Sequence, residues 1–223
     1  MAEKRKDDNP RGRKDRNAGT TGGTWQAHKS ANMRRLILEA AMDAIVEYGY
    51  ARVTTQIIVE RAGVSRGAML HHFPKKQDLL AALVQYIFDR RNTEFTGELI
   101  KSADSSRGDD LRALDIYWTQ SKNPSFVAMV ELSIAARTDP QLAAAFLPIS
   151  QKISNEVYTE HISGFSDWSS DFEAFETAAD LVRCVVLGLT VAYDIRISTT
   201  RRDKVLNLAR EAIKRLRPQG ASA

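Results

Sequence analysis

Apolar side chains recur every three or four residues along the first predicted helix, which we place between residues 30 and 48. Ser30 or Asn32 can cap its start with a side-chain oxygen, and Gly49 ends it. The apolar face of this helix comprises Ile37, Leu38, Ala41, Ile45 and Tyr48. Because one face is apolar and the other polar, the segment is predicted to pack as an amphipathic helix against a core.

Two short helices are predicted next, separated by a glycine turn. The first begins at Thr54, whose side chain suits an N-cap, and it ends before the turn at Gly63. The second runs from Ser65 to His72, and Pro74 breaks it because proline lacks the amide hydrogen and clashes with the preceding turn. This layout is that of a helix-turn-helix motif.

The rest of the chain also has helical periodicity, in longer segments. No run of four to eight residues alternates apolar and polar between turn signals, so no sheet is predicted. The sequence therefore predicts an all-α fold. The further helices are expected at residues 75–102, 109–121, 124–137, 139–163, 171–198 and 201–216, with a loop at 164–170.

Composition narrows the class of protein. The chain has 223 residues and one cysteine, Cys184, which excludes an internal disulfide and a CxxC metal site and fits a reducing compartment. No apolar stretch approaches the roughly 20 residues of a membrane span. The basic N-terminus is followed by no apolar segment, so a signal peptide is not indicated. A cytoplasmic protein is predicted.

Positive charge is concentrated at the N-terminal end. Residues 1–29 carry eight basic and four acidic side chains, which equals the +4 net charge of the whole chain. This segment is too polar to bury a core, so it is predicted to be a disordered tail. We expect two helical regions, at 30–75 and 76–218, and a disordered C-terminus at 219–223. The excess of positive charge points to a polyanionic partner.

The second short helix suits the major groove of DNA, which is about 12 Å wide and admits one α-helix. Arg66 is the residue of this helix able to bind guanine through two hydrogen bonds. Gly67 and Ala68 are small enough to let the backbone approach DNA closely.

Residues 37–80, ILEAAMDAIVEYGYARVTTQIIVERAGVSRGAMLHHFPKKQDLL, resemble the DNA-binding domain of the tetracycline-repressor (TetR) family. The family pattern runs I-L-x-A-A, G-Y, T-T, I-A-x-x-A-G-V-S and Y-x-H-F-x-x-K-x-x-L. Val59 replaces a usual alanine, Ile45 a usual phenylalanine and Leu70 a tyrosine that contacts phosphate in many relatives. The matching positions are Ile37, Leu38, Ala40, Ala41, Gly49, Tyr50, Thr54, Ile58, Ala62 to Ser65, Gly67, His72, Phe73, Lys76, Leu79 and Leu80.

The resemblance implies a homodimeric transcription factor, usually a repressor, that binds a palindromic operator and is released by a small effector. It assigns residues 30–75 to a DNA-binding domain and residues 76–218 to a regulatory domain for effector binding and dimerisation. It implies no cofactor, no metal and no catalytic residue. With the helix-turn-helix reading, it places DNA contacts at Thr54, Thr55, Ser65, Arg66, Gly67, Ala68, Leu70, His71, His72 and Lys76.

Two further sets of residues are expected in the regulatory domain. Candidates for effector contact on the helices expected at 109–163 are Trp118, Phe126, Met129, Arg137, Tyr158 and His161. Candidates for the dimer interface are apolar residues of the last two helices, namely Val182, Val185, Val186, Leu189, Val205, Leu208, Ala212 and Leu216. Packing within one chain would explain either set as well.

Other functions remain open from the residues alone. Gly63 to Gly67 match G-x-S-x-G, the nucleophile elbow of α/β-hydrolases, with Ser65 as the nucleophile, but that elbow needs a strand before the serine. His71 and His72 could indicate a metal site, although neighbouring residues of a helix point about 100° apart. A third possibility is a DNA-binding adaptor whose C-terminal part only dimerises.

Overall fold

The computed structural model describes the backbone of residues 20–101, 109–162, 168, 170–192 and 197–218. Side chains are described for the same residues except 20–24, 109–111 and 153–162. Within these ranges the chain is all-α, as predicted, and contains no strand. The elements are α1 (Thr20–Tyr48), η1 (Tyr50–Arg52), α2 (Thr55–Ala62), α3 (Arg66–His72), α4 (Lys76–Lys101), α5 (Asp109–Gln120), α6 (Pro124–Ala135), α7 (Pro140–Ile162), α8 (Phe172–Val191) and α9 (Thr199–Leu216).

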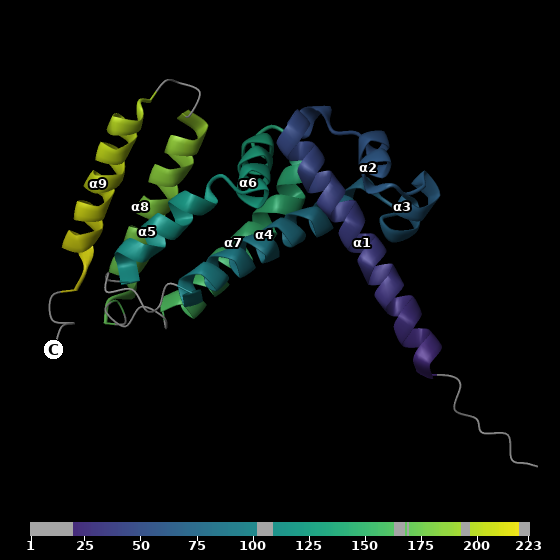
Figure 1. The fold of residues 1–223 in the computed structure, drawn as a ribbon, viewed down its shortest axis with the longest axis horizontal. Helices are drawn as coiled ribbons and strands as arrows, with labels where there is room; N and C mark the ends of the chain where they lie inside the picture. The colour runs from purple at the N-terminus through teal and green to yellow at the C-terminus, as the bar shows by residue number, and fades with distance from the viewer. Residues whose placement is uncertain (1–19, 102–108, 163–167, 169, 193–196, 219–223) are drawn as a thin grey trace, which may run out of the picture.

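Helix α1 begins ten residues earlier than the sequence pattern indicated. The predicted disordered tail reached residue 29, but residues 20–29 continue the helix outward from the body of the molecule (Figure 1). The side chains of residues 25–32 are exposed, so burial does not hold this extension. Extending an existing helix adds one hydrogen bond per residue, which is easier than starting a helix. Residues 1–19 and 219–223 lie outside the described part.

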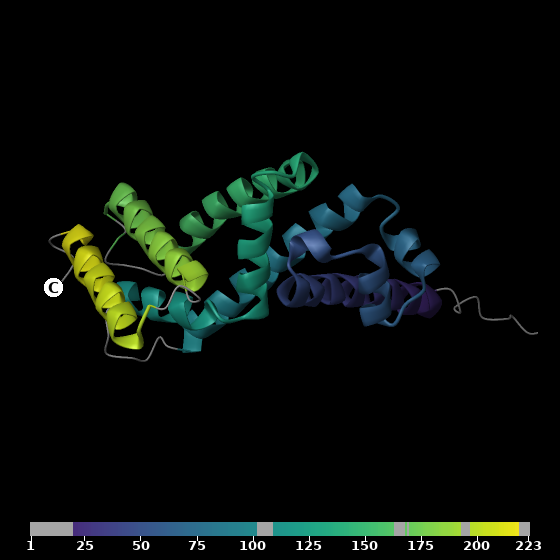
Figure 2. The same cartoon turned by 90° about the horizontal axis from the view of Figure 1, so that it is seen from above.

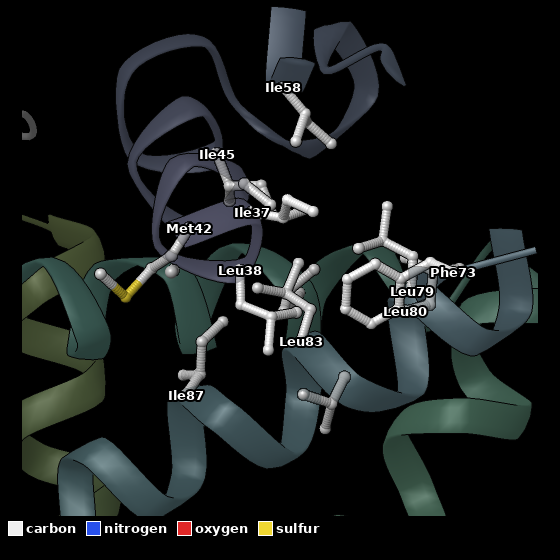
Figure 3. Packing of buried hydrophobic residues seen from close by; sticks show 14 of the residues in the cluster. Ile37, Leu38, Met42, Ile45, Ile58, Phe73, Leu79, Leu80, Leu83 and Ile87 are labelled. Atoms are coloured by element: carbon white, nitrogen blue, oxygen red, sulfur yellow. The ribbon is translucent and has the colours of Figure 1, made fainter. Parts of the chain in front are cut away.

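One buried apolar cluster joins the N-terminal helices to α4, α6 and α7 (Figure 3). Ile37 of α1, Phe73 after α3 and Leu83 of α4 meet in it, together with Leu132 of α6 and Leu142 of α7. The domain boundary expected between residues 75 and 76 falls at the start of α4, whose buried side chains belong to this shared cluster. Because this cluster is closely packed, a movement of α4, α6 or α7 would displace the N-terminal helices as well.

A second cluster lies between α5, α6, α8 and α9 and includes Phe126, Trp168, Val186 and Ile213. Met129 of α6 packs against both clusters and so connects them. Helices α8 and α9 lie at the end of the molecule opposite α2 and α3 (Figures 1 and 2). None of the helices in the described ranges is long and apolar enough to cross a lipid bilayer.

Candidate nucleic-acid interface and regulatory interior

Local capping explains why residues 54–72 fold as two short helices. The Thr54 hydroxyl oxygen accepts a hydrogen bond from the backbone N–H of Ile57 at 3.3 Å and so caps α2. Gly63 ends α2 in the left-handed conformation, at φ 64°, which favours glycine. The Ser65 hydroxyl oxygen accepts from the backbone N–H of Ala68 at 3.1 Å and caps α3. The predicted cap at Thr54 and the predicted glycine turn are confirmed, and Ser65 supplies a second cap.

Helix α3 buries one face and leaves the other open. Met69 packs into the first core, while Arg66 and Leu70 point away from it. A side chain at Gly67 would meet only the Ser65 hydroxyl, at 3.9 Å, so nothing within the chain demands glycine there. Of the predicted DNA-contacting residues, Thr54, Thr55, Ser65, Arg66, Gly67, Leu70, His71 and Lys76 are exposed, and Ala68 and His72 are half-buried.

The geometry at Ser65 is not that of a nucleophile elbow. Ser65 follows helix α2 and the Gly63 turn, whereas the elbow joins a strand to a helix. Its hydroxyl is engaged as the cap of α3. The GVSRG segment is thus explained as a helix-turn-helix connection.

Arg34 of α1 lies at the end of α3, and the sequence patterns did not single it out as a contact residue. Its guanidinium stacks on the ring of Phe73, 4.5 Å from the centroid, and donates to the His72 carbonyl at 3.5 Å. A cation near the C-terminus of a helix suits the helix dipole. Arg34 therefore places an exposed positive charge beside α3, and only the fold brings the two together.

The two histidines differ in their surroundings. Burial, reinforced by the nearby charges of His71 and Arg34, lowers the pKa of His72 below its ordinary value. The His71 and His72 rings meet edge to face, with centroids 5.3 Å apart. In the described ranges no group of three or more His, Cys, Asp or Glu side chains could hold a metal ion.

Helix α4 is capped from inside its first turn. Lys75 stands at the capping position, where lysine is a poor cap, but its backbone N–H donates to the Asp78 carboxylate at 3.1 Å. This arrangement frees the lysine side chains of 75 and 76, which are both exposed. Lys76, the first residue of α4, lines the junction with α7, where its charge contributes to lowering the pKa of Asp139.

A hydrogen bond and a hollow mark the junction between the N-terminal helices and the rest. The Tyr50 hydroxyl of η1 donates to the Asp139 carboxylate at 2.7 Å. Asp139 also caps α7, accepting from the backbone N–H groups of Gln141 and Leu142 at 2.9 and 3.0 Å. These bonds, the Leu142 amide foremost, lower the pKa of Asp139; burial and then Asp139 raise that of Tyr50.

The hollow beside this bond has a volume of about 900 Å³. It lies between α1, η1 and α2 on one side and α4, α6 and the turn before α7 on the other. The polar residues that line it include Lys76, Glu131, Arg137 and Asp139. These charged residues all belong to the regulatory half, whereas the N-terminal half lines the hollow with uncharged residues such as Tyr50 and Thr54.

Three of the six predicted effector residues, Trp118, Phe126 and Met129, lie in or against the second core. Phe126 is fully buried in the second core, and Met129 lies between the two cores. Trp118 is half-buried under Arg202, whose guanidinium lies 5.4 Å from its ring. Arg137 is exposed and lines the junction hollow instead. Tyr158 and His161 have side chains outside the described part.

A positively charged side chain lies among the aromatic residues of the regulatory interior. The Arg91 guanidinium of α4 stacks 4.5 Å from the ring centroid of Phe126 and 5.2 Å from that of Tyr117. Burial lowers the pKa of Arg91 below its ordinary value. The sequence patterns did not identify Arg91 as an interior residue, because a charged residue on a long amphipathic helix is expected to face solvent.

Helices α8 and α9 pack against each other and leave apolar side chains outside. Of the predicted interface residues, Val182, Val186 and Leu189 are buried in the second core of the same chain, and Val185, Ala212 and Leu216 are half-buried. Leu208 is 70% exposed and Val205 38%. On α8, a side chain at Gly188 would meet nothing within 4 Å.

The chain is similar to known regulators over most of its length. The family model described as bacterial regulatory proteins, tetR family, matches residues 37–83. The uncharacterized HTH-type transcriptional regulator Rv2912c of Mycobacterium tuberculosis is 31% identical over 135 residues, which cover 60% of this chain and 68% of that protein. The HTH-type transcriptional repressor AcnR of Corynebacterium glutamicum is 42% identical over 57 residues, 26% of this chain and 30% of AcnR.

Solved structures share the fold. The crystal structure of the multidrug binding protein EbrR complexed with imidazole superposes with a TM-score of 0.62. The match covers 83% of this chain and 94% of EbrR at 17% sequence identity. Identity this low shows a common architecture, an N-terminal helix-turn-helix followed by a helical domain.

Proposed function

The chain belongs to the TetR family of DNA-binding transcriptional regulators, and from this premise we propose that it is a cytoplasmic, ligand-responsive repressor that binds a palindromic operator as a homodimer. The observation that carries the proposal is the capped α2–turn–α3 unit, which holds Arg66, Gly67 and Leu70 on an open face. The repressor role is supported by the name of AcnR, which is similar over the DNA-binding segment.

Dimerisation is proposed through the outer faces of α8 and α9. Leu208 and Val205 form an exposed apolar stripe on α9, and Gly188 leaves room for close approach on α8. Two recognition helices must be about 34–36 Å apart to read successive major grooves on one side of DNA. A two-fold axis at the end opposite α3 would set that spacing.

Release by an effector is proposed to act through the shared first core. An effector that prefers the state with incorrectly spaced recognition helices lowers operator affinity by its differential affinity for the two states. The Tyr50–Asp139 bond and the α4, α6 and α7 side chains of the first core connect the two halves.

The test is a selection of binding sites from random DNA, followed by operator binding with and without compounds that raise the melting temperature. A two-fold symmetric site bound by one dimer is expected, and at least one stabilising compound is expected to release it. Asymmetric sites would contradict the homodimer. If every ligand that stabilises the protein leaves operator affinity unchanged, the adaptor role is favoured instead.

A further inference from the structure

We propose that the regulatory interior binds a carboxylate ligand through the Arg91 guanidinium, between α4, α5 and α6. This inference rests on the proposed function and names the chemical class of its effector. It comes from three observations: an interior cation without a carboxylate partner, aromatic rings on which that cation stacks, and a buried amide donor without an acceptor.

The surroundings of Arg91 are apolar and aromatic. Its guanidinium stacks on Phe126, which is fully buried, and on Tyr117, and these two rings meet edge to face with centroids 5.6 Å apart. Cation–π contacts offset part of the cost of removing a guanidinium from water, but they do not supply an opposite charge.

No carboxylate in the described ranges forms an ion pair with Arg91. Glu94, one turn further along α4, is the nearest acidic influence on it. That carboxylate already accepts from Arg90 at 3.0 Å and from the Asn123 and Ser125 side chains at 3.0 and 2.7 Å. Both oxygens of the Glu94 carboxylate therefore already accept hydrogen bonds from residues other than Arg91.

A second arginine also acts on Arg91. Arg183 of α8 disfavours the charged form of Arg91, although Arg183 itself pairs with Asp180 at 3.6 Å. Burial is the main factor that disfavours the charged form of Arg91, and Tyr117 and Glu94 offset part of it without forming an ion pair. A bound anion would supply that ion pair.

The side-chain amide of Gln120 on α5 is a second hydrogen-bond donor, and it has no partner in the described part of the chain. Gln120 lies three residues beyond Tyr117, one turn along the same helix face, and its side chain is 4% exposed. Its amide nitrogen has no hydrogen-bond partner among the described residues. The Arg91 guanidinium has a hydrogen bond with the Tyr117 side chain but no ion-pair partner in the described ranges. Buried donors are normally paired, so the unpaired Gln120 amide, one helical turn from Tyr117, points to a missing acceptor group.

The chemistry favours a carboxylate over a dianion. One guanidinium balances one negative charge and can hold both oxygens of a carboxylate through two parallel hydrogen bonds. A phosphate ester would bring a second charge into a site lined by Phe126 and Tyr117. The rings can instead contact the apolar body of an organic acid.

The test measures ligand binding by calorimetry and thermal shift with benzoate, phenylacetate and octanoate, each compared with its primary amide and with chloride at equal ionic strength. At least one acid is expected to bind while its amide does not. Arg91→Gln should weaken that acid by about 10- to 100-fold, the loss expected for a charged hydrogen-bonded pair. Arg91→Lys should retain part of the affinity, and the exposed Arg215→Gln should retain all of it.

A structural role for Arg91 is separated by stability without ligand. Arg91→Met keeps the volume and removes the unpaired charge, so it should be at least as stable as the wild type while losing the response to acids. The inference is overturned if no acid stabilises the wild type beyond chloride, if acid and amide bind equally, or if Arg91→Met is markedly destabilised. If an acid binds through Arg91 without releasing the operator, the proposed release by an effector is refuted while the carboxylate site stands. If an amide releases the operator, release by an effector stands while the carboxylate site is refuted.

Discussion

The Tyr50 hydroxyl donates a hydrogen bond to the Asp139 carboxylate at 2.7 Å, across 89 positions of sequence. Tyr50 follows α1 in the short helix that leads to the helix-turn-helix, and Asp139 caps α7. Any rotation of α7 relative to the N-terminal helices has to stretch or break this bond. The pair is therefore a direct polar link between the two halves of the molecule.

Removing the hydroxyl should cost little stability but loosen this link. Tyr50→Phe is expected to lower the free energy of unfolding by about 0.5–1.5 kcal/mol, because Asp139 keeps its two backbone donors. Chemical denaturation measures this value. In a double-mutant cycle with Asp139→Asn, the two effects should fall short of additivity. Full additivity would show that the bond contributes nothing.

The same cycle has a pH signature. The pKa of Asp139 is lowered in the folded chain, so its contribution is complete above the ordinary value of 3.8 and is lost as pH falls below it. The wild type should lose stability more steeply below pH 3.8 than Asp139→Asn does.

Arg66 is expected to read one base pair in each half-site. Arg66→Ala should relax the preference at that position and cost about 1–3 kcal/mol at the preferred site. Site selection from random DNA compares the variant with Arg215→Ala, an exposed arginine at the other end of the molecule. If the selected sequence pattern is unchanged in Arg66→Ala, this role is wrong.

Lys76 is expected to contact phosphate and to carry no sequence information. Lys76→Ala should weaken specific and nonspecific DNA by similar factors and lower the salt slope by about 2 units for a dimer, at about 0.9 per phosphate. Lys101→Ala, at the far end of the same helix, is the matched control. A loss confined to the specific site would contradict the phosphate contact.

The helix-turn-helix was predictable because its signals are local. Thr54, Gly63 and Ser65 determine helix ends through bonds within four residues, and those bonds are present. The start of α1 was not predictable from burial, since residues 25–32 are helical while exposed.

The regulatory half depends on contacts between distant segments. Helix α9 carries two apolar stripes, and periodicity cannot say which one packs inward; the structure buries Leu206, Ala209 and Ile213 and leaves Leu208 outside. Arg91 became a candidate only because α5 and α6 place aromatic rings against it.

Leu208 should hold the dimer together from its exposed position. Leu208→Glu is expected to leave the fold intact and to dissociate the dimer, because a charge in an apolar interface is left without a partner. Sedimentation measures the association state. Cys184 is exposed on α8 one helical turn before Gly188, so the dimer should cover it, and its labelling by maleimide should become faster in the variant. Asn207→Glu, the exposed neighbour on another face of α9, should remain dimeric. A Leu208→Glu dimer of unchanged affinity would place the interface elsewhere.

The basic segment before α1 is expected to add contacts to DNA. Arg11, Arg13, Lys14 and Arg16 precede a helix that begins at Thr20 and runs past α3, so a truncation after residue 19 leaves α1 whole. If two of these residues per subunit touch phosphate, the truncation should flatten the salt slope of the dimer by about 3–4 units.

Operator affinity across a salt series tests this contribution of the tail. Replacing the four basic residues by glutamine in the full chain should flatten the slope as much as the truncation does, because the effect comes from charge and not from chain length. Effector binding should be unchanged in both proteins, since α1 begins at the end of the molecule remote from α8 and α9 (Figure 1). Parallel salt dependences for full-length and truncated protein would show that the segment is a solvated leader without a role in DNA binding.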